Sequence, residues 1–437
     1  MKKLFLALAM VLVLLISGCS ALSLDGSQIM SPPKATGSKA EIQKLIDKQT
    51  SGEYTLMYPK NGSKRSSIIM HNFDKDEDEE AVAFYTDKSG DHIHALFVEY
   101  TDKEYSVIDD ILIEATDVDR IDFADLDGDG THEILIGYSL SMSSQNTLSI
   151  YSYSKQITQL DISCKYSSLV TGDFTSDKRE DILLLSLYSG DLAAQAKLMV
   201  YNDGSLTEIG STELDSDITQ LASAIYGQIS YGTYGAILDG ITSIGDYTTQ
   251  VVLFDASRPS LLNPLYSFSG YSETRRTTQI CSLDFNNDEL IDIPICSLMM
   301  YNSDEDIDTV ARRINWSNLE TDTYGLVTEK SAIACFADGY LLTMPNKWSE
   351  SVTARYDAQS RELKVYACSY VDGVLTKTDE LLTIKAYSEA KFQKDNTEYI
   401  EFLRAGSTVY AYSIGTADHY LSITGDEISS LFRLVNQ

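Results

Sequence analysis

The chain has 437 residues and a formal net charge of −31 at neutral pH, from 65 acidic and 34 basic side chains. Such a charge repels the phosphates of nucleic acids and anionic lipid head groups, which argues against nucleic-acid binding. The length predicts about two or three domains with ample core.

Residues 1–19 predict a lipoprotein export signal. Two lysines follow Met1, residues 4–16 are almost entirely apolar, and Ser17 and Gly18 precede Cys19. The apolar run is too short to span a bilayer as a mature helix. The end of this segment resembles the bacterial lipobox, which implies that Cys19 is acylated, for example with palmitate, and anchors the chain to the outer face of the cytoplasmic membrane or the cell surface. The alternative is an ordinary signal peptide with an incidental cysteine.

Residues 20–53 predict a tether followed by a short helix. The tether is rich in serine and contains Pro32-Pro33. Ser38 and Glu41 have the spacing of a capping box, and Ile42 and Ile46 then fall on one helix face. We expect this face to dock on the body that begins near residue 54, because so short a helix is marginal alone.

The central motif is an acidic run at 125–133, followed directly by the apolar strand 134–138. Asp125, Asp127 and Asp129 alternate, and Glu133 follows four residues later. Clustered carboxylate oxygens suit a hard cation such as Ca²⁺, and without a cation like charges about 4 Å apart repel by about 4 kcal/mol. The helix-loop-helix calcium motif needs a glutamate at its twelfth position, where this chain has Ile136. The sequence therefore predicts a strand-loop-strand calcium site.

The same spacing recurs three more times, with the first ligands at residues 72, 125, 173 and 284. The other three sets of side chains are Asn72, Asp74, Asp76 and Glu80; Asp173, Thr175, Asp177 and Asp181; and Asp284, Asn286, Asp288 and Asp292. The last interval is two periods long and predicts a degenerate copy at 228–236. An aromatic residue follows each of the first three loops and the degenerate copy at nearly constant spacing: Tyr100, Tyr153, Tyr201 and Phe254.

The spacing Asp-x-(Asp/Asn)-x-Asp-x-x-x-(Asp/Glu) before an apolar strand resembles the FG-GAP and VCBS class of repeats, known from integrin α-chain propellers and bacterial surface proteins. The resemblance covers about residues 66–336. It implies calcium ligands at positions one, three, five and nine of each loop and a backbone carbonyl at position seven, which belongs to Asp78, Thr131, Arg179 and Leu290. The chain departs from the pattern at Thr175, and at the sixth position only the second copy has the usual glycine.

Each repeat reads as four strands, of which the one after the metal loop is apolar throughout and therefore buried on both faces. We expect a mainly β fold, with a β-propeller of about five blades over 54–336, because radial repetition protects strand edges. Residues 337–437 predict a small α+β domain. Its expected elements include strands at 362–368 and 381–387, a hairpin formed by 399–403 and 409–414, and a capped helix from Thr424 with Ile428, Leu431, Phe432 and Val435 on one face.

No familiar catalytic motif occurs, so an enzyme is the less favoured interpretation. His92 and His94 share a strand face without a third ligand, and His132 is expected to be solvated. Cys281 and Cys296 either face each other across adjacent strands or remain reduced thiols. Tyr226, Tyr231, Tyr234 and Tyr247 gather in the degenerate repeat, as packing or as a binding surface.

These patterns predict a lipid-anchored extracytoplasmic protein whose calcium-stabilised propeller is a binding or scaffolding module for an envelope protein or glycan. The alternative is a hydrolase or lyase that acts on envelope polysaccharide or peptide.

Overall fold

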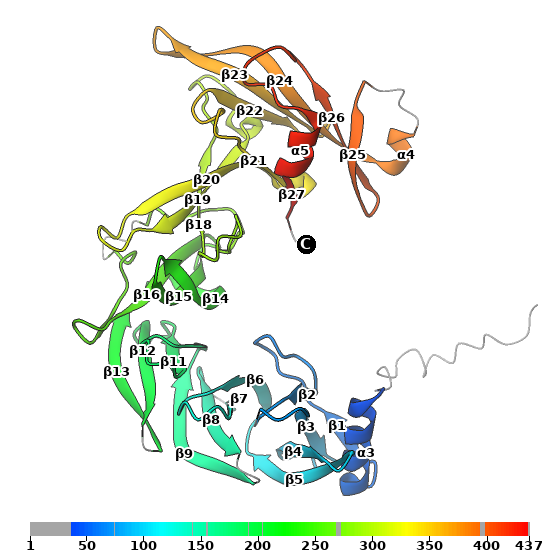
Figure 1. Cartoon of the computed structure of the whole chain (residues 1–437), viewed down its shortest axis with the longest axis vertical. Coiled ribbons are helices and arrows are strands. Elements are labelled where there is room, and N and C mark those ends of the chain that lie inside the picture. The colour runs from blue at the N-terminus through cyan, green and yellow to red at the C-terminus, as the bar shows by residue number, and fades with distance from the viewer. Residues whose placement is uncertain are drawn as a thin grey trace, which may run out of the picture.

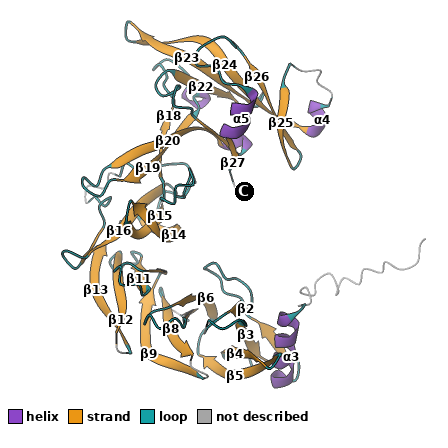
Figure 2. Ribbon diagram, viewed as in Figure 1, coloured by secondary structure: helices purple, strands orange, loops and turns teal. Residues whose placement is uncertain are grey.

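The computed structural model of the chain describes residues 36–435, apart from 74, 142, 154–155, 191, 203, 268–271 and 394–397. The predicted export signal, Cys19, most of the tether and the predicted ligand Asp74 therefore lie outside the described residues. The described part is mainly β and forms six antiparallel sheets, with helices only toward its two ends (Figure 2). Over the same residues, no helix has the length and apolarity needed to cross a membrane.

The first four sheets follow the chain in order. The first contains β1 (Tyr54–Leu56), β2 (Ile68–His71), β3 (Glu80–Asp87), β4 (Ile93–Thr101) and β5 (Glu104–Ile113). The second contains β6 (Asp117–Ala124), β7 (Glu133–Ser139), β8 (Asn146–Tyr153) and β9 (Ile157–Tyr166). The third contains β10 (Ser168–Gly172), β11 (Asp181–Ser186), β12 (Gln195–Asn202) and β13 (Ser205–Glu213). The fourth contains β14 (Ile218–Ser230), β15 (Thr233–Thr242), β16 (Tyr247–Asp255) and β17 (Ser260–Leu262).

The fifth and sixth sheets are intertwined in sequence. The fifth contains β18 (Ile293–Leu298), β19 (Arg312–Leu319), β20 (Leu326–Cys335), β21 (Tyr340–Thr343) and the last strand of the chain, β27 (Phe432–Leu434). The sixth contains β22 (Val352–Asp357), β23 (Glu362–Val371), β24 (Val374–Ser388), β26 (Thr408–Ile414) and β25 (Ile400–Ala405). The predicted domain boundary at 336–337 therefore falls inside the fifth sheet, between β20 and β21.

The sheets follow an open arc, with the first sheet at one end and the sixth at the other (Figure 1). Strands β9 and β13 lie along the outer side of the arc. Among the described strands, none of the first sheet pairs with the sixth.

The hydrophobic cores lie between consecutive sheets. Val82 and Phe84 of β3 share one core with Ile134 and Ile136 of β7, and further cores join each later pair of neighbouring sheets. Strands β3, β7 and β11 are therefore covered on both faces, which explains their continuous apolar sequences. Their burial confirms this part of the sequence prediction. The prediction is wrong for β18, the strand after the fourth predicted loop, because only Ile293 and Pro294 of that strand are buried.

Helix α3 (Ser38–Thr50) packs on the first sheet through the fully buried Ile42 and Ile46. The helix was expected, but its predicted capping box is wrong. The cap is Gly37, which has no side chain and leaves the first backbone N–H groups without a side-chain acceptor.

The C-terminal elements largely match the expected pattern. β25 and β26 form the predicted hairpin, and Thr424 and Glu427 form the predicted capping box of α5 (Gly425–Leu431). The helix ends at Leu431, however, and Phe432 begins β27 instead of extending the helix face. The Phe432 ring stacks on Tyr340 with centroids 4.7 Å apart, so pairing with β21 replaces the last helical turn. The short elements α4 (Glu389–Phe392), η1 (Ile307–Thr309) and η2 (Phe336–Asp338) lie in connections.

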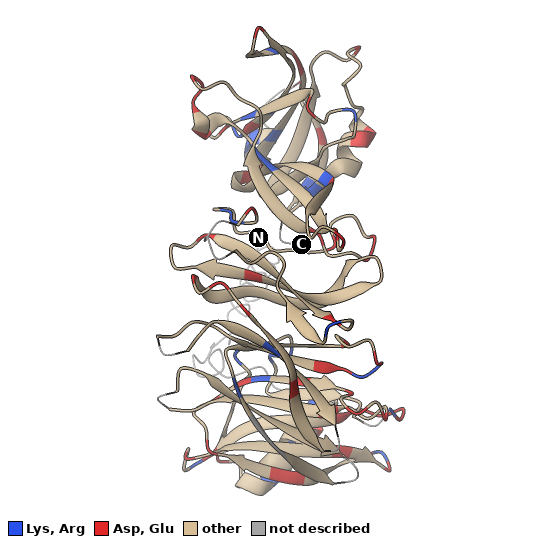
Figure 3. Cartoon of the chain, turned by 90° about the vertical axis from the view of Figure 1, so that its left-hand side faces the viewer, with Lys and Arg blue, Asp and Glu red and all other residues tan. Residues whose placement is uncertain are grey.

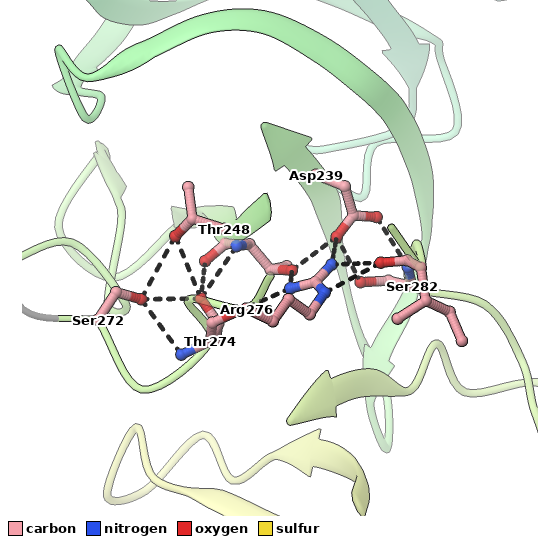
Figure 4. A network of polar contacts seen from close by, with 8 residues as sticks. Asp239, Thr248, Ser272, Thr274, Arg276 and Ser282 are labelled. Atoms are coloured by element: carbon pink, nitrogen blue, oxygen red, sulfur yellow. Dashed lines mark hydrogen bonds and ion pairs between the residues drawn. The ribbon is translucent and has the colours of Figure 1, made fainter. Parts of the chain in front are cut away.

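A fully buried ion pair joins the segment before residues 284–292 to the fourth sheet (Figure 4). Arg276 Nη2 donates to Asp239 Oδ1 at 2.9 Å, and both side chains are completely buried. Every guanidinium nitrogen of Arg276 donates, to Asp239, Thr249 or the carbonyls of Thr274 and Ile280. The pair is therefore well satisfied, as a buried charge requires.

Candidate metal centre

The four acidic loops occupy the same place in their sheets. We call them the first (72–80), second (125–133), third (173–181) and fourth (284–292) acidic loops and number their positions one to nine. The first three connect consecutive strands of one sheet, β2 to β3, β6 to β7 and β10 to β11. The fourth is closed by a bridge between Leu283 and Asp292 and leads into β18. The degenerate copy is the turn between β14 and β15, where Tyr231 is 95% exposed.

All four loops share one hydrogen bond. The backbone N–H at position seven donates to the carboxylate at position five, over 2.7–3.0 Å, in the pairs Asp78 to Asp76, Thr131 to Asp129, Arg179 to Asp177 and Leu290 to Asp288. In the last three loops the N–H at position six also donates to the carboxylate at position one, namely Asp125, Asp173 or Asp284. In the first loop Asn72 stands at position one and accepts from Lys75 N at 2.5 Å. The recurring sequence pattern therefore corresponds to one recurring loop structure.

The loops need a left-handed backbone at position four, where φ is +61° at Lys75, +78° at Gly128, +59° at Ser176 and +60° at Asn287. Position six is also left-handed in the last three loops, at Gly130, Lys178 and Glu289. The sixth-position glycine that only the second copy has is therefore the residue best suited to a conformation that the third and fourth loops also adopt.

The second loop brings its carboxylates closest together. One oxygen from each of Asp125, Asp127 and Asp129 lies within 4.8 Å of the others, and among the described residues this is the one such group of three acidic, histidine or cysteine side chains. Asp127 and Asp129 are exposed and Asp125 is partly so. The group can offer three oxygens to a hard cation that reaches it from solvent.

Other predicted ligands are engaged within their loops. The Thr175 hydroxyl donates to Asp181 at 3.1 Å, and Asn286 Nδ2 donates to Asp288 at 2.8 Å. The carbonyl of Asp76 accepts from Asn72 Nδ2 at 2.5 Å.

The acids at position nine are buried beneath their loops. Glu80, Glu133, Asp181 and Asp292 are at most 4% exposed. Each accepts from a backbone N–H near the start of its loop, over 2.7–3.0 Å, from Phe73, Leu126, Thr175 and Phe285 respectively. These carboxylates therefore close the loops from the core side.

Burial disfavours the charged forms of these acids. Desolvation, together with the neighbouring carboxylates of the loop, raises the pKa of Glu133 to about 7 and the pKa values of Asp181 and Asp292 to about 6. In addition, the buried Asp292 Oδ1 has no hydrogen-bond partner among the described residues. A buried oxygen of this kind is costly unless something polar meets it, and a cation in the fourth loop fits that requirement.

Successive loops are bonded to one another through position eight. His132 N donates to the carbonyl of Phe73, Glu180 N to that of Asp125, and Ile291 N to that of Gln228, over 2.8–2.9 Å. Between the third loop and the degenerate copy, the Tyr226 hydroxyl donates to the carbonyl of Asp173 at 2.6 Å. The loops thus form one connected row, which the sequence did not reveal because the bonds use backbone groups of any residue type.

Two side chains also cross between loops. The Glu180 carboxylate accepts from Asp125 N at 3.0 Å, and Lys75 Nζ lies 3.9 Å from Asp125 Oδ2. Many acidic side chains lie in loops at the margins of the sheets, as Figure 3 shows for one side of the molecule.

The histidines differ from expectation. His132 is not simply solvated, since its Nδ1 lies 3.1 Å from His71 Nε2. Burial, His132 and Lys64 lower the pKa of His71 to about 4. The His94 ring lies 3.0 Å from Asp110 Oδ1 and stacks on Tyr85. These contacts hold the His94 imidazole within the first sheet.

The cysteines Cys281 and Cys296 are free thiols, as are the other three described cysteines. The tyrosines of the degenerate repeat differ in burial. Tyr226 packs on Phe174 with centroids 4.9 Å apart, whereas Tyr231 and Tyr234 are exposed.

Comparisons with known proteins add little to this picture. No family model and no curated protein matches the chain. A crystal structure of a protein from Lactobacillus plantarum matches 73% of this chain and 85% of its own, with 10% sequence identity and a TM-score of 0.30. That degree of likeness establishes neither the fold nor the function.

Proposed function

We propose that the chain is a lipid-anchored extracytoplasmic protein whose row of acidic loops binds Ca²⁺ and stabilises an array of FG-GAP or VCBS-type propeller blades. The array acts as a binding or scaffolding module for an envelope protein or glycan. The observation that carries the proposal is the shared loop structure, in which the carboxylate at position five accepts from position seven in all four loops.

Calcium would supply positive charge where the loops lack it. In the second loop Asp125, Asp127 and Asp129 would hold the ion, and in the fourth loop Asp284, Asp288 and the Oδ1 atom of Asp292 would do so. Because the loops are bonded in a row, an ion in one loop would also steady its neighbours.

The calcium proposal is tested by thermal unfolding of the full-length protein in detergent, with Ca²⁺ or with chelator. Ligand linkage adds about 2.7 kcal/mol per site when free Ca²⁺ is one hundred times the dissociation constant, and less for the weak sites usual outside cells. We expect Ca²⁺ to raise the melting temperature. Asp127→Ala should remove the part of this increase in melting temperature that is due to the second loop.

Thr175→Ala is the matched control, because Thr175 occupies the same loop position but turns its hydroxyl to Asp181. This variant should keep most of the calcium response. A melting temperature that is the same in Ca²⁺ and chelator, with no ion bound by calorimetry, would contradict the proposal.

The anchor is tested separately, because Cys19 lies outside the described residues. Metabolic labelling with a fatty-acid probe should mark the natural chain and leave Cys19→Ala unlabelled. Equal labelling of both proteins would remove the lipid anchor from the proposal.

A further inference from the structure

A polar pocket of about 630 Å³ lies beside β6, β10 and β14. These are the first strands of the second, third and fourth sheets, and they meet the segment before β2 at the pocket. Its lining comes from residues 61–63 and Arg65, from 119–120 and Asp122 in β6, from 167–169 at the start of β10, from Leu187 and from 219–224 in β14. Strands β6 and β10 end at the second and third acidic loops, whereas the pocket lies toward the beginnings of these strands. The pocket is therefore separate from the row of metal loops, and its size is that of a small-ligand site.

The acidic groups of the pocket already have partners. Asp119 is 4% exposed, and its two oxygens accept from Asn61 Nδ2 at 2.8 Å and from the Tyr166 hydroxyl at 2.5 Å. Asp122 accepts from Arg120 Nε at 2.6 Å. The Arg120 guanidinium therefore offsets the charge of Asp122, and both Asp119 oxygens are occupied by neutral donors.

The arginines retain donors. Arg120 is fixed by Asp122 and by its bond from Nη1 to the Leu169 carbonyl at 3.0 Å, which spans the second and third sheets. Arg65 is exposed, and its Nε donates to the Gly62 carbonyl at 3.3 Å. No ion pair joins Arg65 to an acid within the described part of the chain. Its two terminal nitrogens, in the planar fork that suits carboxylates and phosphates, are therefore open to a ligand.

Hydroxyl groups complete the lining. Ser63, Ser168 and Ser223 come from three different segments and face the same pocket as Arg65. Hydroxyls both donate and accept, which suits the hydroxyls of a sugar. The pocket thus combines guanidinium donors for an oxyanion with hydroxyls for a polyol.

We propose that this pocket binds an acidic sugar unit, with Arg65 holding its carboxylate or phosphate and the serine hydroxyls contacting its hydroxyls. The proposal rests on the proposed function as a binding module and names the ligand class and the site. The net charge of −31 repels long polyanions, so the pocket suits a unit with one oxyanion, such as a chain end.

The test is isothermal titration of the full-length protein in detergent with three probes: galacturonate, maltose 1-phosphate and neutral maltose. We expect at least one acidic probe to bind at one site per chain and maltose to bind at least tenfold more weakly. The acidic probe that binds identifies the oxyanion as carboxylate or phosphate. Failure of both acidic probes, or equal binding of maltose, would overturn the inference.

The Arg65→Ala variant should weaken binding of the acidic probe by about tenfold or more, because charge-assisted hydrogen bonds are lost. Lys44→Ala is the matched control. It makes the same charge change at an exposed position on α3, outside the pocket, and should change the affinity less than twofold. Unchanged affinity in Arg65→Ala would also overturn the inference.

Calcium-dependent melting of the same preparations separates the two proposals. A calcium response without binding of any acidic probe rejects the pocket alone. Binding that requires Arg65, without any calcium response, rejects the calcium role alone.

Discussion

At the residue scale, left-handed backbone is the feature that shapes the acidic loops. An L residue in this conformation costs about 1–2 kcal/mol, whereas glycine adopts it freely. The third and fourth loops nevertheless place Lys178 and Glu289 there. The hydrogen bonds to Asp173 and Asp284 hold this backbone in place.

Replacing Glu289 with glycine should therefore stabilise the protein. We expect Glu289→Gly to raise the free energy of unfolding by about 0.5–1 kcal/mol, after allowance for the greater freedom of glycine in the unfolded chain. Chemical denaturation measures this difference.

Glu77→Gly is the control for this variant. Glu77 holds the same sixth position in the first loop, but its φ is not positive. Its replacement with glycine makes the same charge change as Glu289→Gly. The free energy of unfolding of Glu77→Gly should stay the same or fall. An equal gain in both variants would mean that relief of charge repulsion, and not the backbone conformation, is responsible.

Sequence could predict where the acidic loops lie because carboxylates at alternate positions leave a readable spacing. It could not predict which oxygens remain open. Asn286 fits the pattern and Thr175 departs from it, yet both side chains donate within their loops. His132 was misjudged because its partner, His71, is the last residue of β2, 61 residues earlier in the chain.

At the element scale, the strand after each of the first three acidic loops was the most predictable feature. An apolar run without alternation requires cover on both faces, and the cores between neighbouring sheets provide it. The end of α5 was less predictable. Residues 428–435 have helical periodicity, but pairing of Phe432 with Leu342 in β21 gives a strand instead. Tertiary pairing of this kind overrides local propensity.

The buried pair of Arg276 and Asp239 gives a prediction at this scale. Arg276→Met would leave the Asp239 carboxylate buried without its cation, so we expect a loss of about 3–5 kcal/mol in the free energy of unfolding. Thermal and denaturant unfolding measure the loss.

The neighbouring Arg275 provides the control for this substitution. Its pairs with Asp217 and Asp246 are about one third exposed, so Arg275→Met should cost less than about 1 kcal/mol. Equal losses in the two variants would show that burial of the Arg276 pair has no special weight.

At the scale of the whole molecule, the sheets are joined through contacts that the sequence does not display. The row of loops is linked by backbone groups, and the fifth sheet takes its last strand from the end of the chain. The repeat period predicted a series of similar sheets, but an open arc depends on how successive sheets pack. That packing leaves no periodic signal.

The junction between the fifth and sixth sheets depends on Glu305, which lies between β18 and β19. Its Oε1 accepts from Asn302 N at 3.1 Å, and its Oε2 accepts from Arg355 of β22 at 2.7 Å and from Lys377 of β24 at 3.0 Å. Burial alone would raise the pKa of Glu305, but these hydrogen bonds and charges lower it to about 2.

This shift predicts how the junction responds to acid. The folded-state pKa lies below the ordinary value of 4.5, so the carboxylate stabilises the fold fully above about pH 4.5. That contribution is lost as the pH falls from about 4.5 toward 2, because the unfolded chain then binds the proton more readily. Glu305→Gln cannot titrate and should lose less stability than the natural chain over this interval, although it is less stable at neutral pH. Denaturant unfolding at several pH values, with Glu350→Gln as an exposed control, measures the difference. If the two variants follow the same pH dependence as the natural chain, Glu305 does not hold the sixth sheet to the arc through its charge.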